Sequence, residues 1–432
     1  MKKKKEERKI NFWGMDFSLE WTSLAMDISL FAFFCTKTFL GQLAILEYIA
    51  FAAFIGFTIV HVLKFRKKHG LKPKTKVFFI WYGAFALFAA LSILWALSAE
   101  FVLKVLPSVI ALSVFAVAIT YYAEDKNQLN KVIHFYLVSN LLAAVIILIG
   151  FPFVEGVAAK RVGIITGIAP NTVLQTISLS VIIAVYYAIK KKEKKYLALA
   201  ILAMIAVVLS ASRKAILVSI VGVATLFIIK KKSKHERRVY ACFFILLICI
   251  IGAMAVVSEG FRTEMTGLFT SFLPGHDSGD WSVYLRNFFR DTAISLWQQR
   301  PLIGSGLNNF AYYVANDTWY TKNRYAHDNY VELLADLGLI GTILYYLIYV
   351  YVIVKIVRLF KNKKDTKANV DFTFVVAMII SLAMVDYGAV SYSGVMYNVI
   401  IFVIFYLSNY SIEDGNEFCG KLNAESRNRK KK

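Results

Sequence analysis

Long apolar blocks run through most of this sequence, one after another, from residue 18 to residue 410. Each is close to the ~20 residues that a helix needs to cross a hydrocarbon core about 30 Å thick. Apolar residues make up 58% of the chain, whereas soluble domains contain roughly 45–50%. The alternation typical of transmembrane strands forms no recurring pattern. Because lipid offers the backbone no hydrogen-bond partner, the sequence predicts an all-α, polytopic transmembrane protein.

The apolar blocks predict about twelve membrane spans. Two of them, 196–210 and 214–229, are short, and only Ser210–Arg213 separates them. The first block contains Asp27 and lacks a small-residue cleavage pattern, so we expect no cleaved signal peptide. The predicted spans are residues 18–36, 41–63, 77–97, 101–122, 130–151, 171–189, 196–210, 214–229, 239–257, 329–354, 370–387 and 393–410.

Lys and Arg residues give the chain a net charge of +22, and their placement indicates an orientation. The loops at residues 37–40, 98–100 and 386–392 nearly lack them. Every second loop and both ends are rich in them, which is the positive-inside pattern and predicts that both termini are cytoplasmic. We interpret the basic runs as topology signals and contacts with lipid headgroups, so nucleic acid is not an expected partner. The runs are Lys2–Lys9, Lys64–Lys76, Lys190–Lys195, Lys230–Arg238, Lys355–Lys367 and Lys421–Lys432.

This layout divides the chain into four segments. We expect an N-terminal bundle of about nine spans in residues 1–257 and an extracytoplasmic loop with amphipathic helices in residues 258–328. C-terminal transmembrane helices in residues 329–410 and a basic cytoplasmic tail in residues 411–432 complete it. The cysteines offer no disulfide framework and no zinc spacing, and we expect no metal or cofactor. They are Cys35, Cys242, Cys249 and Cys419.

The segment 258–328 is too polar to cross the membrane and too long for a simple connector. Its stretch Val283–Gln299 has helical periodicity, with Arg286 and Arg290 one turn apart on one face. We interpret this stretch as an amphipathic helix at the membrane interface. Arg300 and Pro301 end it, and Gly304–Gly306 predicts a turn. The apolar face comprises Leu285, Phe288, Phe289, Ile294 and Trp297.

Basic side chains and a histidine gather in this loop, which suits chemistry on a lipid-linked diphosphate. On an outer membrane face there is no nucleotide sugar, so a sugar donor must come through or within the membrane. Arg stabilises charge on a departing diphosphate, and His accepts a proton near neutral pH. His276 and His327 are the histidines predicted to be external, and His327 adjoins a helix start. The cations are Arg286, Arg290, Arg300, Lys322 and Arg324, with Arg213 at the outer mouth of a neighbouring hairpin.

Each candidate also has a purely structural interpretation. Beside His327, Asp328 or Asn329 can simply cap a helix, which would leave the imidazole in solvent. Arg286 can extend toward lipid headgroups, and Arg213 can anchor a helix end. Arg161 can be solvated in its loop, and Asn171 can cap the helix that follows it.

The region Arg286–Gly341 resembles the signature region of the O-antigen ligase and polymerase superfamily. An Arg opens an amphipathic helix, Pro-Leu-Ile-Gly-Ser-Gly follows at 301–306, and a variable loop leads to Ala-His-Asp-Asn-Tyr at 326–330. Gly-Leu-Ile-Gly at 338–341 closes the pattern. Upstream, Ser212-Arg213 and the Arg-Val-Gly…Pro-Asn stretch at 161–171 resemble family motifs as well. The resemblance therefore extends over roughly residues 160–345.

The resemblance implies a membrane glycosyltransferase of the GT-C type, with a glycan on undecaprenyl diphosphate as donor and a glycan or cell-surface acceptor. His327 would be the catalytic base, while Arg286 and Arg213 would hold the diphosphate. The sequence departs from the family at Arg290, where an aromatic residue is frequent, and at Asp328, where Asn is frequent. The implied substrate-binding residues are Arg290, Arg324, Arg161, Asn171 and Asn329.

Two alternatives stay open at this point. The sequence does not separate a ligase from a polymerase, because acceptor choice depends on variable loops; the Lys-rich composition favours a capsule or wall polysaccharide. About twelve spans would also suit a flippase or another transporter of the bacterial plasma membrane, whose essential charges normally lie near the bilayer midplane. The charges inside the predicted spans are scattered, and they are Asp27, Glu47, Lys104, His134 and Asp386.

Overall fold

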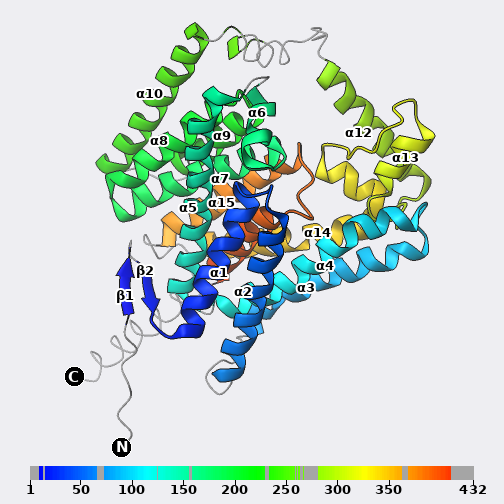
Figure 1. The fold of residues 1–432 in the computed structure, drawn as a ribbon, viewed down its shortest axis with the longest axis horizontal. Coiled ribbons are helices and arrows are strands. Elements are labelled where there is room, and N and C mark those ends of the chain that lie inside the picture. The colour runs from blue at the N-terminus through cyan, green and yellow to red at the C-terminus, as the bar shows by residue number, and fades with distance from the viewer. Residues whose placement is uncertain are drawn as a thin grey trace, which may run out of the picture.

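The computed structural model shows a bundle of helices with one small hairpin near the N-terminus (Figure 1). It describes residues 9–12, 15–65, 73–123, 125–154, 158–228, 233–257, 259, 261–262, 266, 281–361 and 368–409. The prediction of an all-α protein is confirmed except for strands β1 (Lys9–Phe12) and β2 (Met15–Ser18), which pair antiparallel. The hairpin was not predicted, because strands of four residues carry too little periodicity to stand out from a loop.

A helix lies at the position of every predicted span. Among the described residues, seven helices are long and apolar enough to cross a membrane, so the protein is an integral membrane protein of the all-α class. The full number of about twelve spans and the orientation of the termini stay predictions. The helices are α1 (Trp21–Thr38), α2 (Ala44–Lys64), α3 (Pro73–Leu91), α4 (Ala99–Tyr122), α5 (Lys126–Gly150), α7 (Pro170–Lys191), α8 (Lys194–Leu209), α9 (Arg213–Ile228), α10 (Lys234–Val257), α14 (Asn329–Lys361), α15 (Ala368–Asp386) and Val395–Asn409.

Shorter helices connect the long ones. The amphipathic helix predicted at Val283–Gln299 is present as α12 (Trp281–Gln299), and its position at a membrane interface stays a prediction. The structure adds α6 (Ala158–Thr166) and α13 (Asn309–Asp317), together with the 3₁₀ turns η1 (Ser92–Leu94) and η2 (Phe151–Phe153). Helices of nine residues such as α6 and α13 escape a sequence analysis because they are too short to show a clear period.

Helix α7 forms the centre of the bundle, between α5, α8 and α9. In its apolar stretch 94% of the residues are buried inside the protein, against 17% for α2 and 22% for α10. Leucines and isoleucines on α2 and α10 therefore face outward, where lipid replaces protein as the apolar surroundings. The burial identifies α7 as the core helix and α2 and α10 as peripheral ones.

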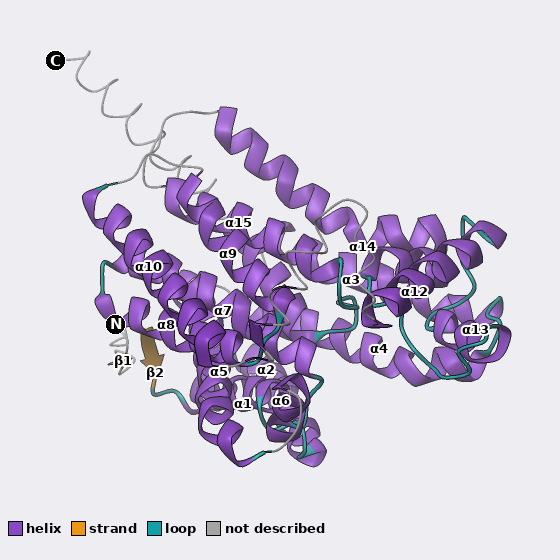
Figure 2. Cartoon of the chain, turned by 90° about the horizontal axis from the view of Figure 1, so that it is seen from above, coloured by secondary structure: helices purple, strands orange, loops and turns teal. Residues whose placement is uncertain are grey.

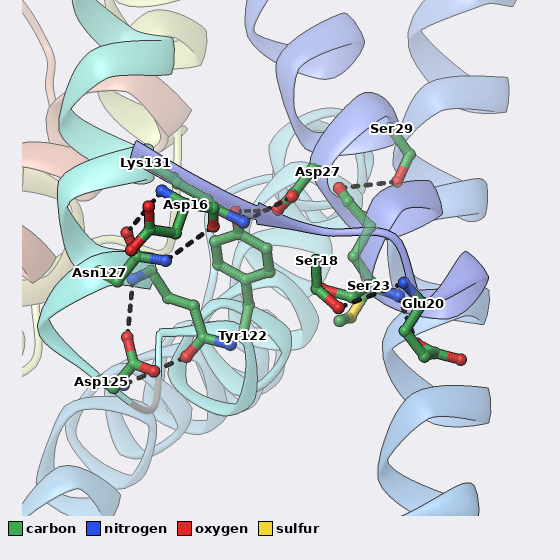
Figure 3. A network of polar contacts seen from close by, with 12 residues as sticks. Asp16, Ser18, Glu20, Ser23, Asp27, Ser29, Tyr122, Asp125, Asn127 and Lys131 are labelled. Carbon is green, nitrogen blue, oxygen red and sulfur yellow. Dashed lines mark hydrogen bonds and ion pairs between the residues drawn. The ribbon is translucent and has the colours of Figure 1, made fainter. Parts of the chain in front are cut away.

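A buried ion pair joins α1 to α5 beneath the N-terminal hairpin (Figure 3). The Lys131 ammonium lies 2.7 Å from an Asp27 carboxylate oxygen, and Tyr122 donates a hydrogen bond of 2.6 Å to the other oxygen. On the hairpin, the backbone N–H of Asp16 donates to the side chain of Asn127, which donates back to the Asp16 carbonyl. Buried charges are tolerated when they are paired and hydrogen-bonded, so this network fixes the hairpin and α1 on α5.

Loops that the charge pattern assigns to one side meet one another in the structure. Gly41, after α1, donates a backbone hydrogen bond to Thr166 at the end of α6. Leu97, before α4, donates to the carbonyl of Ser305, which follows α12. Figures 1 and 2 both place α12 and α13 at one edge of the molecule, where α13 contacts α4 and α12 contacts α14. This edge carries the candidate site.

Candidate functional site

The two glycine motifs of the sequence form one joint between the loop after α12 and a kink in α14. Helix α14 is interrupted at Gly338, with φ 63° and ψ −166°. The backbone N–H of Gly306 donates to the carbonyl of Asp336 at 2.7 Å, and that of Leu339 donates to the carbonyl of Pro301 at 2.8 Å. The loop therefore satisfies backbone groups that the kink leaves without helical partners.

Glycine is required in this joint because two backbones touch there. A Cβ on Gly304 would lie 2.4 Å from the carbonyl oxygen of Asp336, and a Cβ on Gly338 would lie 2.4 Å from the backbone of Leu302. Both glycines also have positive φ angles, 67° and 63°, a conformation that side-chain-bearing residues rarely adopt. The motifs that carried the family resemblance thus have a packing role, which is to fix the start of α14.

Buried carboxylates at the start of α14 hold the flanking loops. The two oxygens of Asp336 accept backbone hydrogen bonds of 2.7 Å from Asn308 and Phe310. Glu332 accepts a hydrogen bond from the backbone N–H of Ala326. Asp328 caps the helix, because its Oδ1 accepts from the N–H of Tyr330 at 2.9 Å. The residues on either side of position 327 are therefore held in place.

His327 lies between these anchored residues in a left-handed backbone conformation, with φ 57°. Such a conformation is uncommon for a residue other than glycine, and it persists where the surroundings enforce it, often at functional sites. The imidazole is half-buried, 4.0 Å from the ring centroid of Tyr325 and 6.1 Å from that of Phe289 on α12. The joint, the carboxylates and the cap together aim this side chain.

The surroundings of His327 favour its neutral form. Burial lowers its pKa to about 4, assisted by the positive charges of Arg286, Lys214 and Arg324. At pH 7 the imidazole is therefore uncharged and can accept a proton. The three cations within electrostatic reach give this corner of the protein a positive charge.

Helix α12 supplies two of the cations, one helical turn apart as predicted. Arg290 lies 3.5 Å from Asp328, and its guanidinium lies 4.7 Å from the ring centroid of Tyr387, which follows α15. Arg286 is exposed, and within the part of the chain that the structure describes no hydrogen bond or ion pair engages its guanidinium. Arg290 is thus held by the protein, whereas Arg286 is available to a ligand.

Lys214 is the cation that the sequence analysis missed. It lies in the first turn of α9, and its ammonium touches Gly388 in the segment after α15. Arg286, Arg290 and Asp328 are all within its electrostatic reach. A signal was present, because Lys214 and Arg213 form a basic pair at the end of a predicted span whose side is otherwise poor in cations.

The structure places the other predicted residues around this cluster or outside it. Arg213 is half-buried at the start of α9, and because successive helical residues point about 100° apart it differs in direction from Lys214. Arg324 is exposed and acts on His327. Asn171 is exposed in the first turn of α7, and the side chain of Arg161 on α6 lies outside the described residues. For these four residues a substrate contact stays a prediction.

Asn329, which was predicted to bind substrate, forms hydrogen bonds inside the protein that the sequence did not indicate. Its side chain is fully buried and donates a hydrogen bond of 2.9 Å to the Tyr346 hydroxyl. Its oxygen accepts from the backbone N–H groups of Ser391 and Tyr392 at 2.9 and 3.2 Å. Asn329 thereby anchors the segment that carries Tyr387 and Gly388 against the site.

The cluster as a whole offers an anion site beside a neutral base. Exposed and half-buried cations lie around His327, and the carboxylate of the next residue, Asp328, is engaged in capping α14 and in pairing with Arg290. In the described ranges, no group of three or more His, Cys, Asp or Glu side chains is placed to hold a metal ion. The described side chains therefore offer several positive charges next to an uncharged imidazole.

A comparison with protein families adds an observation that is independent of this geometry. Residues 197–346 match the family model described as O-antigen ligase. This part of the chain is therefore similar to the O-antigen ligase family, and the predicted resemblance to this superfamily is confirmed. The match includes α9, α12, the glycine joint and His327, but the 161–171 stretch lies outside it. No curated protein matches the chain.

Proposed function

We propose that this protein is a membrane glycosyltransferase that transfers or polymerises a glycan carried on undecaprenyl diphosphate. In the proposed step, an acceptor hydroxyl attacks the anomeric carbon of the donor sugar. The hydroxyl proton goes to His327, the bond between the sugar and the diphosphate breaks, and its electron pair leaves with the diphosphate. The products are the elongated glycan and undecaprenyl diphosphate, and no nucleotide sugar or metal takes part.

The charge state of His327 suits it for accepting this proton. With a pKa of about 4 the free imidazole is neutral but weakly basic. A bound diphosphate would offset the positive charges of Arg286, Lys214 and Arg324, and so would raise that pKa. The imidazole would therefore become a stronger base only when the donor is in place, which couples proton transfer to donor binding.

The cations divide into those that contact the donor and those that orient the site. Arg286 carries the binding of the diphosphate in this proposal, because it is exposed, planar and not engaged by a carboxylate among the described residues. Arg213 and Arg324 would add charge at the rim. Arg290, tied to Asp328 and stacked on Tyr387, would define the wall of the site.

Arg161 and Asn171 precede or begin α7, outside the matched domain. We propose that they contact the acceptor glycan at the outer membrane surface. The acceptor itself would be a growing glycan chain or another component of the cell surface. The whole site would face outward from a bacterial cytoplasmic membrane, with both termini on the cytoplasmic side.

One observation carries this proposal: a neutral histidine and an available arginine lie together in the matched domain although they belong to different segments of the chain. The test uses the purified full-length protein in lipid nanodiscs with an isolated undecaprenyl-diphosphate-linked oligosaccharide. A ladder of products on a gel indicates a polymerase, and a single shifted acceptor indicates a ligase. Both outcomes should survive a chelator. The absence of any product would remove the proposal.

The transport alternative gains no support from the charges inside the bundle. Asp27 is paired with Lys131, and His134 is hydrogen-bonded to the Tyr196 hydroxyl at 3.0 Å. Asp386 accepts hydrogen bonds from Tyr346 and Ser391. Groups that lead a substrate across a membrane normally line a cavity or a water-filled path. These groups are instead engaged with their own protein neighbours.

A further inference from the structure

The side chain of Lys214 occupies a space that only a glycine at position 388 leaves open. A Cβ built on Gly388 would lie 1.2 Å from the Lys214 ammonium nitrogen and 2.2 Å from its Cε. The two residues belong to different elements, the first turn of α9 and the segment after α15. Gly388 is in turn held by the backbone hydrogen bond from its N–H to the carbonyl of Val385 at 2.9 Å. The contact therefore sets where the ammonium lies.

The charges that face Lys214 come from two other elements. Arg286 and Arg290 approach from α12, and Asp328 approaches from the start of α14. The two oxygens of Asp328 are committed, one to the N–H groups that begin α14 and one to Arg290. Positive charge thus exceeds negative charge around Lys214. Holding like charges together in a half-buried place is unfavourable unless an anion joins them.

We propose that Lys214 contacts the diphosphate of the donor as a further cation of the binding site, and that Gly388 positions it there. This inference rests on the proposed function, because it names a contact to the same donor. Lysine acts on phosphate as a point charge, whereas arginine acts through a planar fork, so Lys214 complements Arg286 instead of duplicating it. The matched domain contains Lys214 but ends before Gly388.

Lys214 also links the donor to the base. The groups that face His327 are Arg286 and Phe289 from α12, Lys214 from α9, and Tyr325 and Arg324 from its own segment. Among them, Lys214 is one of the cations that hold the imidazole neutral. A diphosphate on Lys214 would therefore change the proton affinity of His327 as well as its own binding.

The test compares Lys214→Met, Lys214→Arg and Gly388→Ala with the unmodified full-length protein in nanodiscs. Binding of undecaprenyl diphosphate should weaken about 10–100-fold in Lys214→Met, as expected for the loss of a charged hydrogen bond. Gly388→Ala should act in the same direction, since it displaces the ammonium without removing it. Because the displaced atoms are the far end of a flexible side chain, we expect its fold to survive. Lys214→Arg should retain more binding than Lys214→Met.

The double variant and the pH dependence distinguish this role from a structural one. Lys214→Met combined with Gly388→Ala should bind no more weakly than Lys214→Met alone, because both changes act through one ammonium. Lys214→Met should also move the acid limb of kcat/KM to higher pH, since removing a positive charge makes His327 easier to protonate. Lys104→Met serves as the control. Lys104 pairs with Glu100 in the first turns of α4, so this variant should bind the donor normally.

Two results would overturn the inference. In the first, Lys214→Met and Gly388→Ala both bind undecaprenyl diphosphate normally and keep the acid limb of kcat/KM, while His327→Ala or Arg286→Met abolishes transfer. The proposed function would then hold, but without a role for Lys214. The other is a strictly additive double variant. If Lys214→Met fails to fold, Gly388→Ala and Lys214→Arg still test whether the cation contacts the diphosphate, since both variants keep a positive charge. If every one of these variants, including His327→Ala and Arg286→Met, keeps full transfer activity, the proposed function itself is wrong.

Discussion

His327 shows how a single residue acquires its chemistry from neighbours that are distant in the chain. Its backbone is left-handed, and the residues on either side are held, Ala326 by Glu332 and Asp328 by capping α14. Its ring is shielded by Tyr325 and Phe289, and burial together with nearby cations keeps it neutral. These contacts leave the imidazole uncharged at pH 7, which is the form that the proposed proton transfer requires.

The pH dependence of transfer follows from this charge state. His327 must be neutral to accept a proton, and its pKa in the free protein is about 4, so kcat/KM should fall only as the pH approaches about 4. The acid limb of kcat should lie at higher pH, because the bound diphosphate raises that pKa. Rates measured between about pH 4 and 8 check both limbs. If the acid limbs of kcat/KM and of kcat both lay near the ordinary histidine pKa of about 6.5, the surroundings would not change the pKa of His327.

Arg286→Lys tests the geometry of the diphosphate contact. A lysine keeps the charge but loses the planar fork, so kcat/KM for the donor should fall about 10-fold or more. The control is Arg358→Lys, at an exposed residue near the far end of α14, which should transfer normally. Equal activity of Arg286→Lys and the unmodified protein would favour the interpretation of Arg286 as a headgroup contact.

For the individual residues of the candidate site, the sequence predicted which kinds of side chain take part but only some of their contacts. His327 and the arginine pair of α12 were singled out because their chemistry and spacing are local features. The basic pair Arg213–Lys214 was a signal in the sequence, but the contact of Lys214 with Gly388, which lies far along the chain, could not be predicted from it. Asn329 was assigned to substrate, although its hydrogen bonds to the segment at Ser391 and Tyr392 can be known only from the fold.

Among the elements, the joint between the 301–306 loop and the kink of α14 determines where the site residues stand. It aligns the loop after α12 with the start of α14, which directly follows His327 and the capping residue Asp328. The same loop is held from the other side by the turn before α4, since Arg300 donates a hydrogen bond of 2.7 Å to the carbonyl of Trp95. Three parts of the chain thus meet at one joint.

Gly338→Ala should disturb this joint. The new methyl group would meet the backbone of Leu302 and force a positive φ on alanine, at a cost of about 1–3 kcal/mol. Thermal unfolding in detergent should show lower stability, and transfer should fall with it, because the start of α14 would shift. Gly252→Ala in α10 is the matched control: its Cβ would meet nothing within 4 Å, so its stability should be unchanged or slightly raised. Equal stability of the two variants would argue against the joint.

The elements differed in how well the sequence predicted them. The long apolar helices and α12 were found at their expected positions, because hydropathy and helical period are strong over many residues. The N-terminal hairpin, α6 and α13 were missed because they are short. The kink at Gly338 was also missed, because the glycine motif gave no indication of the loop that packs on it.

For the molecule as a whole, the bundle places the loops of one side together and leaves a charged pair in its interior. Seven candidate spans agree with an integral membrane protein, and α7 is enclosed by the others. The pairing of Asp27 with Lys131 was not predictable, since the two residues lie on different helices and the sequence shows only isolated charges. The alternation of basic loops, in contrast, could be read directly from the sequence.

The Asp27–Lys131 pair should matter to the stability of the bundle. Asp27→Ala leaves a buried ammonium without its partner, at a cost of about 3–5 kcal/mol. Asp27→Leu combined with Lys131→Met removes both charges and should be clearly less destabilising. Thermal unfolding in detergent compares the three proteins. If the single and double variants lose the same stability, the pair is not what joins α1 to α5.

The proposal that the cluster around His327 performs glycosyl transfer is tested most directly by one substitution. His327→Ala in the reconstituted full-length protein should abolish transfer from undecaprenyl-diphosphate-linked oligosaccharide while leaving protein levels and donor binding intact. His276→Ala, the same change at the other histidine of the predicted outer loop, should transfer at the normal rate. Normal transfer by His327→Ala would show that the imidazole is not the base and that the proposed chemistry is wrong.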